Sequence, residues 1–265
     1  MLNSKRKGQI FKIHSDFYYI KFQDEDVYEC KVREVLKKQK QNILVGDFVQ
    51  CDDVNYNKKT AVIVDILPRK NFLTHPSVAN VEQVVIVSAI KEPELNFEQL
   101  NRYICFAKYH KLKIKLCFNK NDLSEDDSVI EKVFEIYEPL GFDIIFTSAL
   151  EGVGIDDFKE ILNGKTTVFC GNSGVGKSSL INAISPGLNI RTKKVSEKTN
   201  RGTHTTRHCE IINIKNGKKD IKIIDTPGFS NLKFDFLLPT EVGDLFDEIK
   251  ALKSDCKFKD CLHIQ

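Results

Sequence analysis

Residues 166–180, with the sequence TTVFCGNSGVGKSSL, decide the fold of this chain. The first five of these residues form a short β-branched and apolar run, which predicts a buried strand. Residues 171–178 then match G-x-x-x-x-G-K-[ST] at every fixed position, and residues 179–184 predict a helix. The order of strand, glycine-rich turn and helix is the context that this phosphate-binding loop (P-loop) requires.

The residue types of this loop suit a chain of phosphates. Its glycines let the backbone approach phosphate oxygens where a Cβ would clash, and its N–H groups and the helix N-terminus form an anion site. Lys177 is expected to reach the β- and γ-phosphates, and the Ser178 hydroxyl is expected to bind Mg²⁺. The residues predicted to hold the nucleotide here are Gly171, Asn172, Ser173, Gly174, Val175, Gly176, Lys177, Ser178 and Ser179.

The composition is that of an ordinary protein of 265 residues, 41% hydrophobic and 29% charged, with a net charge of +3. No run approaches the length of a transmembrane helix, and the N-terminus lacks the apolar core of a signal peptide. We therefore expect a cytoplasmic protein with no membrane partner and reduced cysteines. We also expect a monomer.

The charge is unevenly placed along the chain. Residues 1–70 carry 14 Lys and Arg against 10 Asp and Glu, a balance of +4. This excess points to a polyanionic partner for the N-terminal part. A solvated lysine-rich surface explains it equally well.

Residues 8–66 have the composition of five short strands separated by polar turns, over residues 8–13, 17–22, 27–32, 47–54 and 60–66. Five short strands suit a small closed barrel, with an OB-fold as the leading candidate. Such barrels often bind nucleic acid, and the candidate contact residues are Lys31, Arg33, Lys37, Lys38, Lys40, Phe17, Tyr18 and Tyr19. For each of the three aromatic residues, packing in the barrel core is the alternative.

From residue 81 the pattern changes to strands that alternate with helices. The predicted strands span residues 84–87, 113–118 and 143–147, and the predicted helices span 97–109, 128–137 and 155–162. This alternation predicts an α/β domain with a mostly parallel sheet and helices on both faces. Residues 68–79, which are polar and contain two prolines, are interpreted as a linker.

Two loops of this region carry the chemistry of base recognition. The tetrapeptide NKND fits N-K-x-D, and the Asp122 carboxylate can accept hydrogen bonds from guanine N1–H and the 2-amino group, which adenine lacks in that arrangement. Asn119 and Lys120 are expected to hold the loop and pack the base. After the next strand, Ser148 and Ala149 form a loop that offers a backbone N–H to guanine O6. Both loops follow the C-terminal ends of predicted strands. Open α/β sheets bind their ligands at the edge where these strand ends lie.

Residues 186–207, after the P-loop helix, are polar and contain GTHTTR. Thr205 or Thr206 can complete the Mg²⁺ shell and sense the γ-phosphate, with Thr206 as the predicted Mg²⁺ ligand. A generic polar loop is the alternative.

The tetrapeptide DTPG follows a predicted hairpin of strands over residues 208–214 and 221–224. It fits D-x-x-G. Asp225 is expected to bind Mg²⁺ through water, and the Gly228 N–H is expected to approach the γ-phosphate.

The chain resembles the RsgA (YjeQ) family of bacterial GTPases, which act in small ribosomal subunit maturation. N-K-x-D precedes the P-loop instead of following DTPG, which is the order of a circularly permuted GTPase, and GNSGVGKSSL, THTTRH and DTPGF carry the resemblance over essentially the whole chain. The resemblance implies an OB-fold barrel over residues 1–68 and a permuted GTPase domain over residues 69–235. It also implies the start of a zinc-binding module over residues 236–265.

The same resemblance implies ligands and partners. GTP with Mg²⁺ is the expected substrate, and the small ribosomal subunit with its rRNA is the expected partner that stimulates hydrolysis. Cys256, Cys261 and His263 match three zinc ligands of the family pattern. The fourth, a Cys a few residues further on, is absent because the chain stops at Gln265, and we interpret the sequence as truncated. Two free thiols beside a surface histidine are the alternative.

The residue that orients the attacking water is also expected to differ from that of Ras-like GTPases. Those enzymes place a Gln just after D-x-x-G, where this chain has Phe229, which cannot form a hydrogen bond through its side chain. His204 is the best candidate, because its imidazole can accept or donate. The alternative is a surface histidine with no catalytic role.

Two other functions stay open at this point. One is a GTP-gated module that binds an RNA or protein unrelated to the ribosome. The other is a P-loop ATPase or small-molecule kinase, against which Asp122 argues.

Overall fold

The computed structural model describes residues 5–23, 26–38, 42–74, 76–188, 209–217, 219–225, 237–258 and 261–262, without the side chains of Lys37 and Asp225. The backbone forms two compact units. One consists of residues 1–83, 159–169 and 194–229, and the other of residues 84–158, 170–193 and 230–265. No helix in the described ranges is long and apolar enough to cross a membrane.

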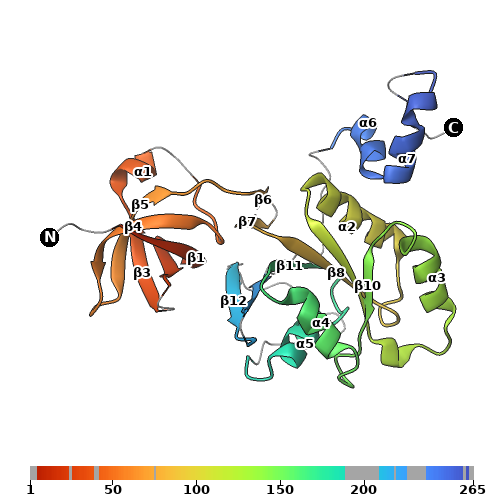
Figure 1. The fold of residues 1–265 in the computed structure, drawn as a ribbon, viewed down its shortest axis with the longest axis horizontal. Coiled ribbons are helices and arrows are strands. Elements are labelled where there is room, and N and C mark those ends of the chain that lie inside the picture. Colours follow the sequence, from red (N-terminus) through yellow and green to blue (C-terminus); the bar gives the residue numbers. More distant parts are fainter. Residues whose placement is uncertain are drawn as a thin grey trace, which may run out of the picture. The chain divides into compact units, whose positions relative to one another are not determined.

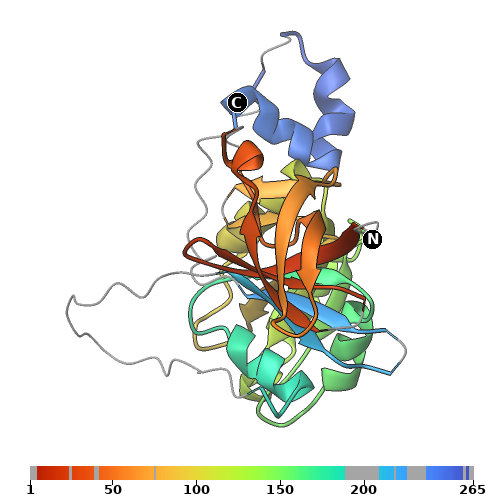
Figure 2. The same cartoon turned by 90° about the vertical axis from the view of Figure 1, so that its left-hand side faces the viewer.

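The first unit begins with the predicted barrel, whose orange and red strands are seen in Figure 2. Its strands are β1 (Arg6–His14), β2 (Phe17–Lys21), β3 (Val27–Val32), β4 (Phe48–Asn55) and β5 (Thr60–Ile66), with the short helix α1 (Glu34–Lys38) after β3. The pairing order is β1-β2-β3-β5-β4, and β4 pairs again with β1. The five strands therefore close into the barrel that the sequence predicts.

Buried and exposed residues alternate along the barrel strands, and the buried ones form the barrel core. In β3, Tyr28, Cys30 and Val32 are buried while the residues between them are exposed. Tyr18 packs against this core, so this residue packs in the barrel, which was the alternative to contacting nucleic acid. Phe17 instead lies under the Lys31 ammonium, 5.3 Å from the ring centroid.

The prediction of a linker over residues 68–79 is wrong. The segment contains β6 (Phe72–Thr74) and β7 (Ser77–Ala79), which form a two-stranded antiparallel sheet. Leu73 and Val78 are fully buried, and the Ala79 N–H donates to the Val45 carbonyl at 2.8 Å. The segment is part of the packed structure because these apolar side chains leave water.

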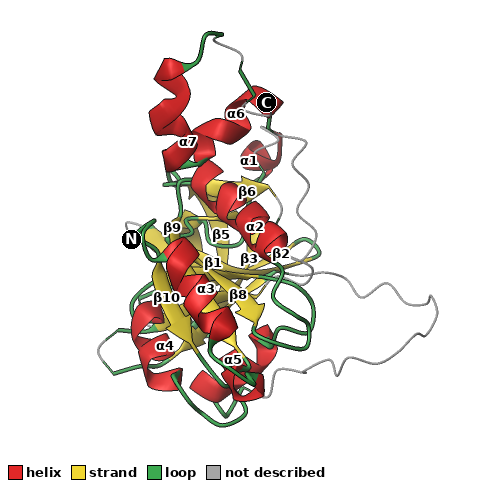
Figure 3. Cartoon of the chain, turned by 90° about the vertical axis from the view of Figure 1, so that its right-hand side faces the viewer, coloured by secondary structure: helices red, strands yellow, loops and turns green. Residues whose placement is uncertain are grey.

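The second unit contains β8 (Gln83–Ala89, whose first residue belongs to the first unit), β9 (Lys113–Asn119) and β10 (Asp143–Phe146) in the order β10-β9-β8. Strands β9 and β10 run parallel, with Phe118 opposite Phe146. Helices α2 (Phe97–Tyr109) and α3 (Ser128–Tyr137) cover one face of these strands (Figures 1 and 3). The alternation of strands and helices is thus confirmed.

The phosphate-loop strand belongs to the first unit except for its last residue. Helix α4 (Ile155–Leu162) leads into β11 (Thr166–Cys170), and β12 (Glu210–Ile214) and β13 (Ile221–Asp225) form the predicted hairpin. Strand β11 pairs parallel with β13, and β12 pairs antiparallel with both β13 and β1. Strands β11 and β13 therefore end at the same edge, where the P-loop and the DTPG motif begin.

The described C-terminal segment is helical. It contains α6 (Pro239–Val242) and α7 (Asp247–Leu252). The Lys108 ammonium of α2 forms an ion pair with Asp247 at 2.6 Å, which ties α7 to the second unit.

Candidate nucleotide-binding site

The P-loop connects β11 to α5 (Lys177–Ile184) through backbone conformations that favour glycine. Gly171 has φ +143°, and a Cβ there would lie 2.1 Å from the Val87 carbonyl oxygen. Gly176 has φ +97°, and a Cβ there would lie 2.1 Å from Asn119 Nδ2. The two fixed glycines are thus required by close contacts as well as by φ, which fits a loop that wraps around phosphates.

Lys177 lies over this loop. Its Nζ donates to the carbonyl oxygens of Gly171 and Asn172, both at 2.7 Å. The ammonium is therefore held at the P-loop, and its contact with the β- and γ-phosphates stays a prediction.

The buried side chain of Asn119 joins three loops. Its Nδ2 donates to the Val175 carbonyl of the P-loop at 2.9 Å. Its Oδ1 accepts from Thr147 Oγ1 and from the Ala149 N–H, both at 3.1 Å. The Asn119 side chain thus connects the end of β9 with the P-loop and with the loop after β10.

Asp122 and Ser148, two residues predicted to recognise the base, form a hydrogen bond with each other. Ser148 Oγ donates to Asp122 Oδ1 at 2.5 Å. A carboxylate has about four acceptor positions, so this bond leaves capacity for the two donors of guanine. Lys120 adopts the left-handed conformation with φ 61°, and its Nζ donates to the Glu92 carbonyl oxygen.

One backbone N–H of the loop expected to meet guanine O6, that of Ala149, is already bonded within the protein. It donates to Asn119 Oδ1, so a contact to guanine O6 would have to share or replace that bond. The physical reason is burial. Asn119 is 1% exposed, so its amide oxygen is shielded from water and accepts hydrogen bonds from neighbouring protein groups instead.

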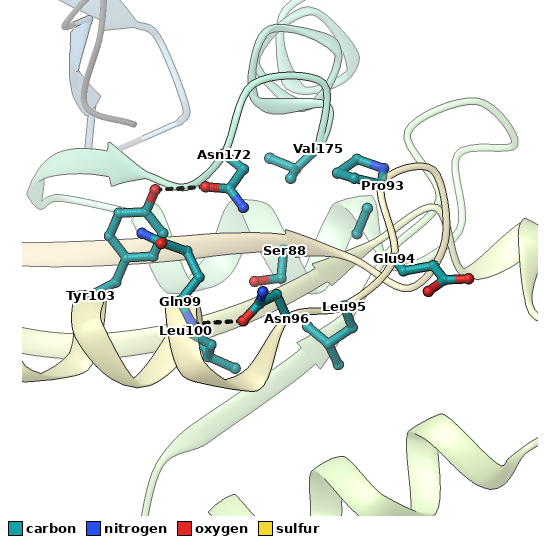
Figure 4. Close-up of a pocket in the computed structure, with 11 residues that line it drawn as sticks. Ser88, Pro93, Glu94, Leu95, Asn96, Gln99, Leu100, Tyr103, Asn172 and Val175 are labelled. Atoms are coloured by element: carbon teal, nitrogen blue, oxygen red, sulfur yellow. Dashed lines mark hydrogen bonds between the residues drawn. The ribbon is translucent and has the colours of Figure 1, made fainter. Parts of the chain in front are cut away.

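The structure adds Tyr103, which the sequence did not single out. Figure 4 shows its hydroxyl directed at the P-loop, where it donates to Asn172 Oδ1 at 3.0 Å. Burial raises the pKa of Tyr103, which keeps its hydroxyl protonated and able to donate. Tyr103 and Asn172 line a cavity of about 10 Å³, room for roughly one water and not for a nucleotide. Tyr103 is thus a positioning residue for the P-loop.

Cys170 directly precedes the P-loop but has no role as a nucleophile. It is fully buried, and this burial raises the pKa of its thiol well above the usual value. A thiol that stays protonated in an apolar environment is inert.

Several predicted site residues lie outside the described residues, namely His204, Thr205, Thr206, Gly228 and His263. Asp225 ends β13, which places its backbone at the expected strand terminus. The roles predicted for these residues therefore stay predictions.

Cys256 and Cys261 lie close to each other after α7. The pKa of the Cys256 thiol is raised by desolvation and by a hydrogen bond with the Cys261 thiol. Within the described ranges, no group of three or more His, Cys, Asp or Glu is placed to hold a metal ion. Two neighbouring thiols fit half of a tetrahedral zinc site.

Family models match most of the chain. Residues 66–235 match the RsgA GTPase family, and residues 7–63 match the RsgA N-terminal domain. Among curated relatives, proteins named small ribosomal subunit biogenesis GTPase RsgA are similar. The one from Alkaliphilus metalliredigens is 40% identical, covering 97% of this chain and 87% of that protein. The one from Bacillus subtilis is 38% identical, covering 98% and 87%.

Solved structures agree with these matches. YjeQ from Thermotoga maritima is 33% identical with a TM-score of 0.82, covering 99% of this chain and 88% of that one. YloQ, described as a circularly permuted GTPase, is 33% identical with a TM-score of 0.78, covering 99% and 85%. Together with the motif order and the closed barrel, these matches establish that the chain belongs to the RsgA GTPase family.

Proposed function

We propose that this chain binds the small ribosomal subunit in the cytoplasm and hydrolyses GTP during maturation of that subunit. The observation that carries the proposal is the hydrogen-bond network of Asn119, which holds the Asp122 loop and the Ser148 loop against the P-loop. This network joins base recognition to phosphate binding. The curated relatives are named for the same biological role.

In the proposed reaction, water attacks the γ-phosphorus in line with the bond to the β–γ bridging oxygen. That bond breaks and leaves GDP and inorganic phosphate. Lys177 and the loop N–H groups stabilise the charge that develops on the phosphate oxygens. The Ser178 hydroxyl in the first turn of α5 is an oxygen ligand that would suit Mg²⁺, which would supply positive charge to offset the charge that develops on the phosphates.

We divide the chain into the barrel (residues 1–68), the permuted GTPase domain (69–235) and the C-terminal module (236–265). Of the barrel cations, Lys31 and Lys38 are exposed and suited to rRNA phosphates. Arg33 is less suited, because its guanidinium lies 3.7 and 3.9 Å from the Asp52 and Asp53 carboxylates.

Stimulation by the subunit is the test of this function. The GTPase rate should rise strongly when purified small subunits are added. His204→Ala should lower the stimulated rate about 10²-fold, because the attacking water loses its positioning group, with little change in GTP affinity. His204→Gln should restore part of the rate, since an amide can also orient water.

Three results would contradict parts of this view. A fast rate for the isolated protein would remove the need for a partner. Full stimulation of His204→Ala would eliminate His204 as the positioning residue. Subunits that bind without changing the rate would favour a GTP-gated binding switch.

We also propose that Cys256, Cys261 and His263 are ligands of a Zn²⁺ ion, since thiolates and imidazole are the ligands that suit zinc. A Co²⁺ titration should therefore show thiolate absorption bands. Cys256→Ser should abolish these bands, and Cys209→Ser should leave them. A titration without thiolate bands would contradict the site.

A further inference from the structure

A groove in the first unit is lined by lysines. Lys165, Lys215, Lys219 and Lys222 face an open space of about 540 Å³, together with Gly164 and Asp220. We call it the lysine groove. No motif of the sequence pointed to it, because its walls come from two segments that are far apart in the chain.

The backbone holds the two walls together. The turn between α4 and β11 forms one wall, and the β12–β13 hairpin forms the other. The Gly164 N–H donates to the Asp220 carbonyl, and the Lys222 N–H donates to the Lys165 carbonyl, both at 3.2 Å. The lysine groove is therefore built on paired strands and is not an accidental gathering of side chains on one loop.

The positive charge of this groove is only partly compensated. Lys215 forms an ion pair with Asp220 at 3.3 Å. Lys222 Nζ donates to the neutral Gln9 amide oxygen at 2.9 Å. Lys165, Lys219 and Lys222 have no carboxylate within ion-pair distance in the part of the chain that the structure describes. Three lysine charges are thus available to one ligand.

The lining favours phosphates over a protein surface. Protein interfaces depend on buried aromatic or aliphatic anchors, and the lysine groove has no aromatic or aliphatic residue in its lining. Nucleic acid backbones need only closely spaced cations, which release the counterions condensed on the phosphates. Four lysines in one groove match the second requirement.

The lysine groove is separate from the nucleotide site. Lys165 directly precedes β11 and Gly171 directly follows it, so the five residues of this strand lie between them. The backbone takes six steps from Lys165 to Gly171, and at ~3.3 Å per residue this distance is about 20 Å, too far for one ligand group to occupy both places.

We propose that the lysine groove binds the phosphate backbone of RNA, as a second RNA-binding surface in addition to the barrel. The inference rests on the proposed function, since the RNA meant is that of the small ribosomal subunit.

The test compares two double variants across a range of salt concentrations. Lys165→Gln/Lys219→Gln removes two groove lysines that have no carboxylate partner among the described residues, and Lys113→Gln/Lys250→Gln removes two exposed lysines elsewhere. Affinity is measured for purified small subunits with a non-hydrolysable GTP analogue, and for a short RNA duplex. The groove variant should lower the slope of log affinity against log salt by about 2, roughly one for each lysine that no longer neutralises a phosphate. The control variant should keep the original slope, and GTP affinity should be unchanged in both.

Each outcome separates this inference from the proposed function. An unchanged slope in the groove variant overturns the inference and leaves the function standing. Weaker subunit binding with an unchanged slope places these lysines against ribosomal protein and also overturns it. If the unmodified chain does not bind subunits, the proposed function fails, and a lower slope on the RNA duplex would still support the groove as an RNA site.

Discussion

Asp122→Asn is expected to change the preferred nucleotide from GTP to xanthosine triphosphate, with GTP affinity lowered on the order of 10³-fold. Guanine presents two donors to this position, N1–H and the 2-amino group. An Asn side chain offers one acceptor and one donor, so its amide N–H₂ would face the 2-amino group without a partner. A site built to bond a polar group rejects a mismatched partner by about this factor.

The structure explains why the variant should gain affinity for xanthine. Ser148 Oγ donates to Asp122 Oδ1 at 2.5 Å, and the same hydroxyl can donate to the amide oxygen of Asn. That bond orients the amide so that its nitrogen can meet the base. Xanthine has a carbonyl at C2, which accepts the bond that the guanine amino group cannot.

The matched control is Asp126→Asn. Asp126 lies in the same loop region, and its carboxylate accepts from the Ser128 backbone N–H and hydroxyl at 3.0 and 2.5 Å. This variant loses the same charge without altering the Asp122 side chain. Binding of both nucleotides is measured by calorimetry, and an Asp122→Asn variant that still prefers GTP would show that the base is read elsewhere.

The sequence predicted those elements whose signal is local. Helix α2 was expected over residues 97–109 and spans Phe97–Tyr109, because its apolar residues recur with helical spacing and Asn96 caps its start. The barrel strands were predicted because alternation and polar turns recur over short distances. Residues 68–79 were misjudged because their packing depends on Val45, more than 30 residues earlier.

The same difference between local and long-range signals applies to the nucleotide-binding site. The P-loop and N-K-x-D were predicted because fixed spacing imposes their chemistry. The bond between Tyr103 and Asn172 joins residues 69 positions apart, and one tyrosine in an amphipathic helix carries no mark of such a partner. The bond from the Ala149 N–H to Asn119 was missed for a related reason. A sequence motif predicts which residues come together in a site, but it does not predict the hydrogen bonds between them.

Gly176→Ala is expected to lower GTP affinity about 10³-fold while the protein stays folded. A non-glycine residue in the left-handed region costs about 1–2 kcal/mol. The added Cβ would lie 2.1 Å from Asn119 Nδ2, so the amide must move as well. Its movement breaks the bond to the Val175 carbonyl and leaves buried polar groups without partners, at about 1–3 kcal/mol each. Together these costs approach 4 kcal/mol, which corresponds to the stated factor.

Gly187→Ala is the matched control, because nothing lies within 4 Å of a Cβ at that position and its φ is not in the left-handed region. Calorimetric GTP binding should be unchanged in this variant, and thermal unfolding should show that both proteins are folded.

A double-mutant cycle tests whether the clash with Asn119 causes the loss of affinity. In an Asn119→Ala background the Cβ of residue 176 no longer meets the amide, so Gly176→Ala should cost only the backbone strain, roughly 10-fold in affinity. If the full 10³-fold decrease persists in that background, the P-loop itself rejects the side chain, and Asn119 does not couple base recognition to phosphate binding. If the decrease shrinks as expected, the buried amide is the physical link between the two halves of the nucleotide site.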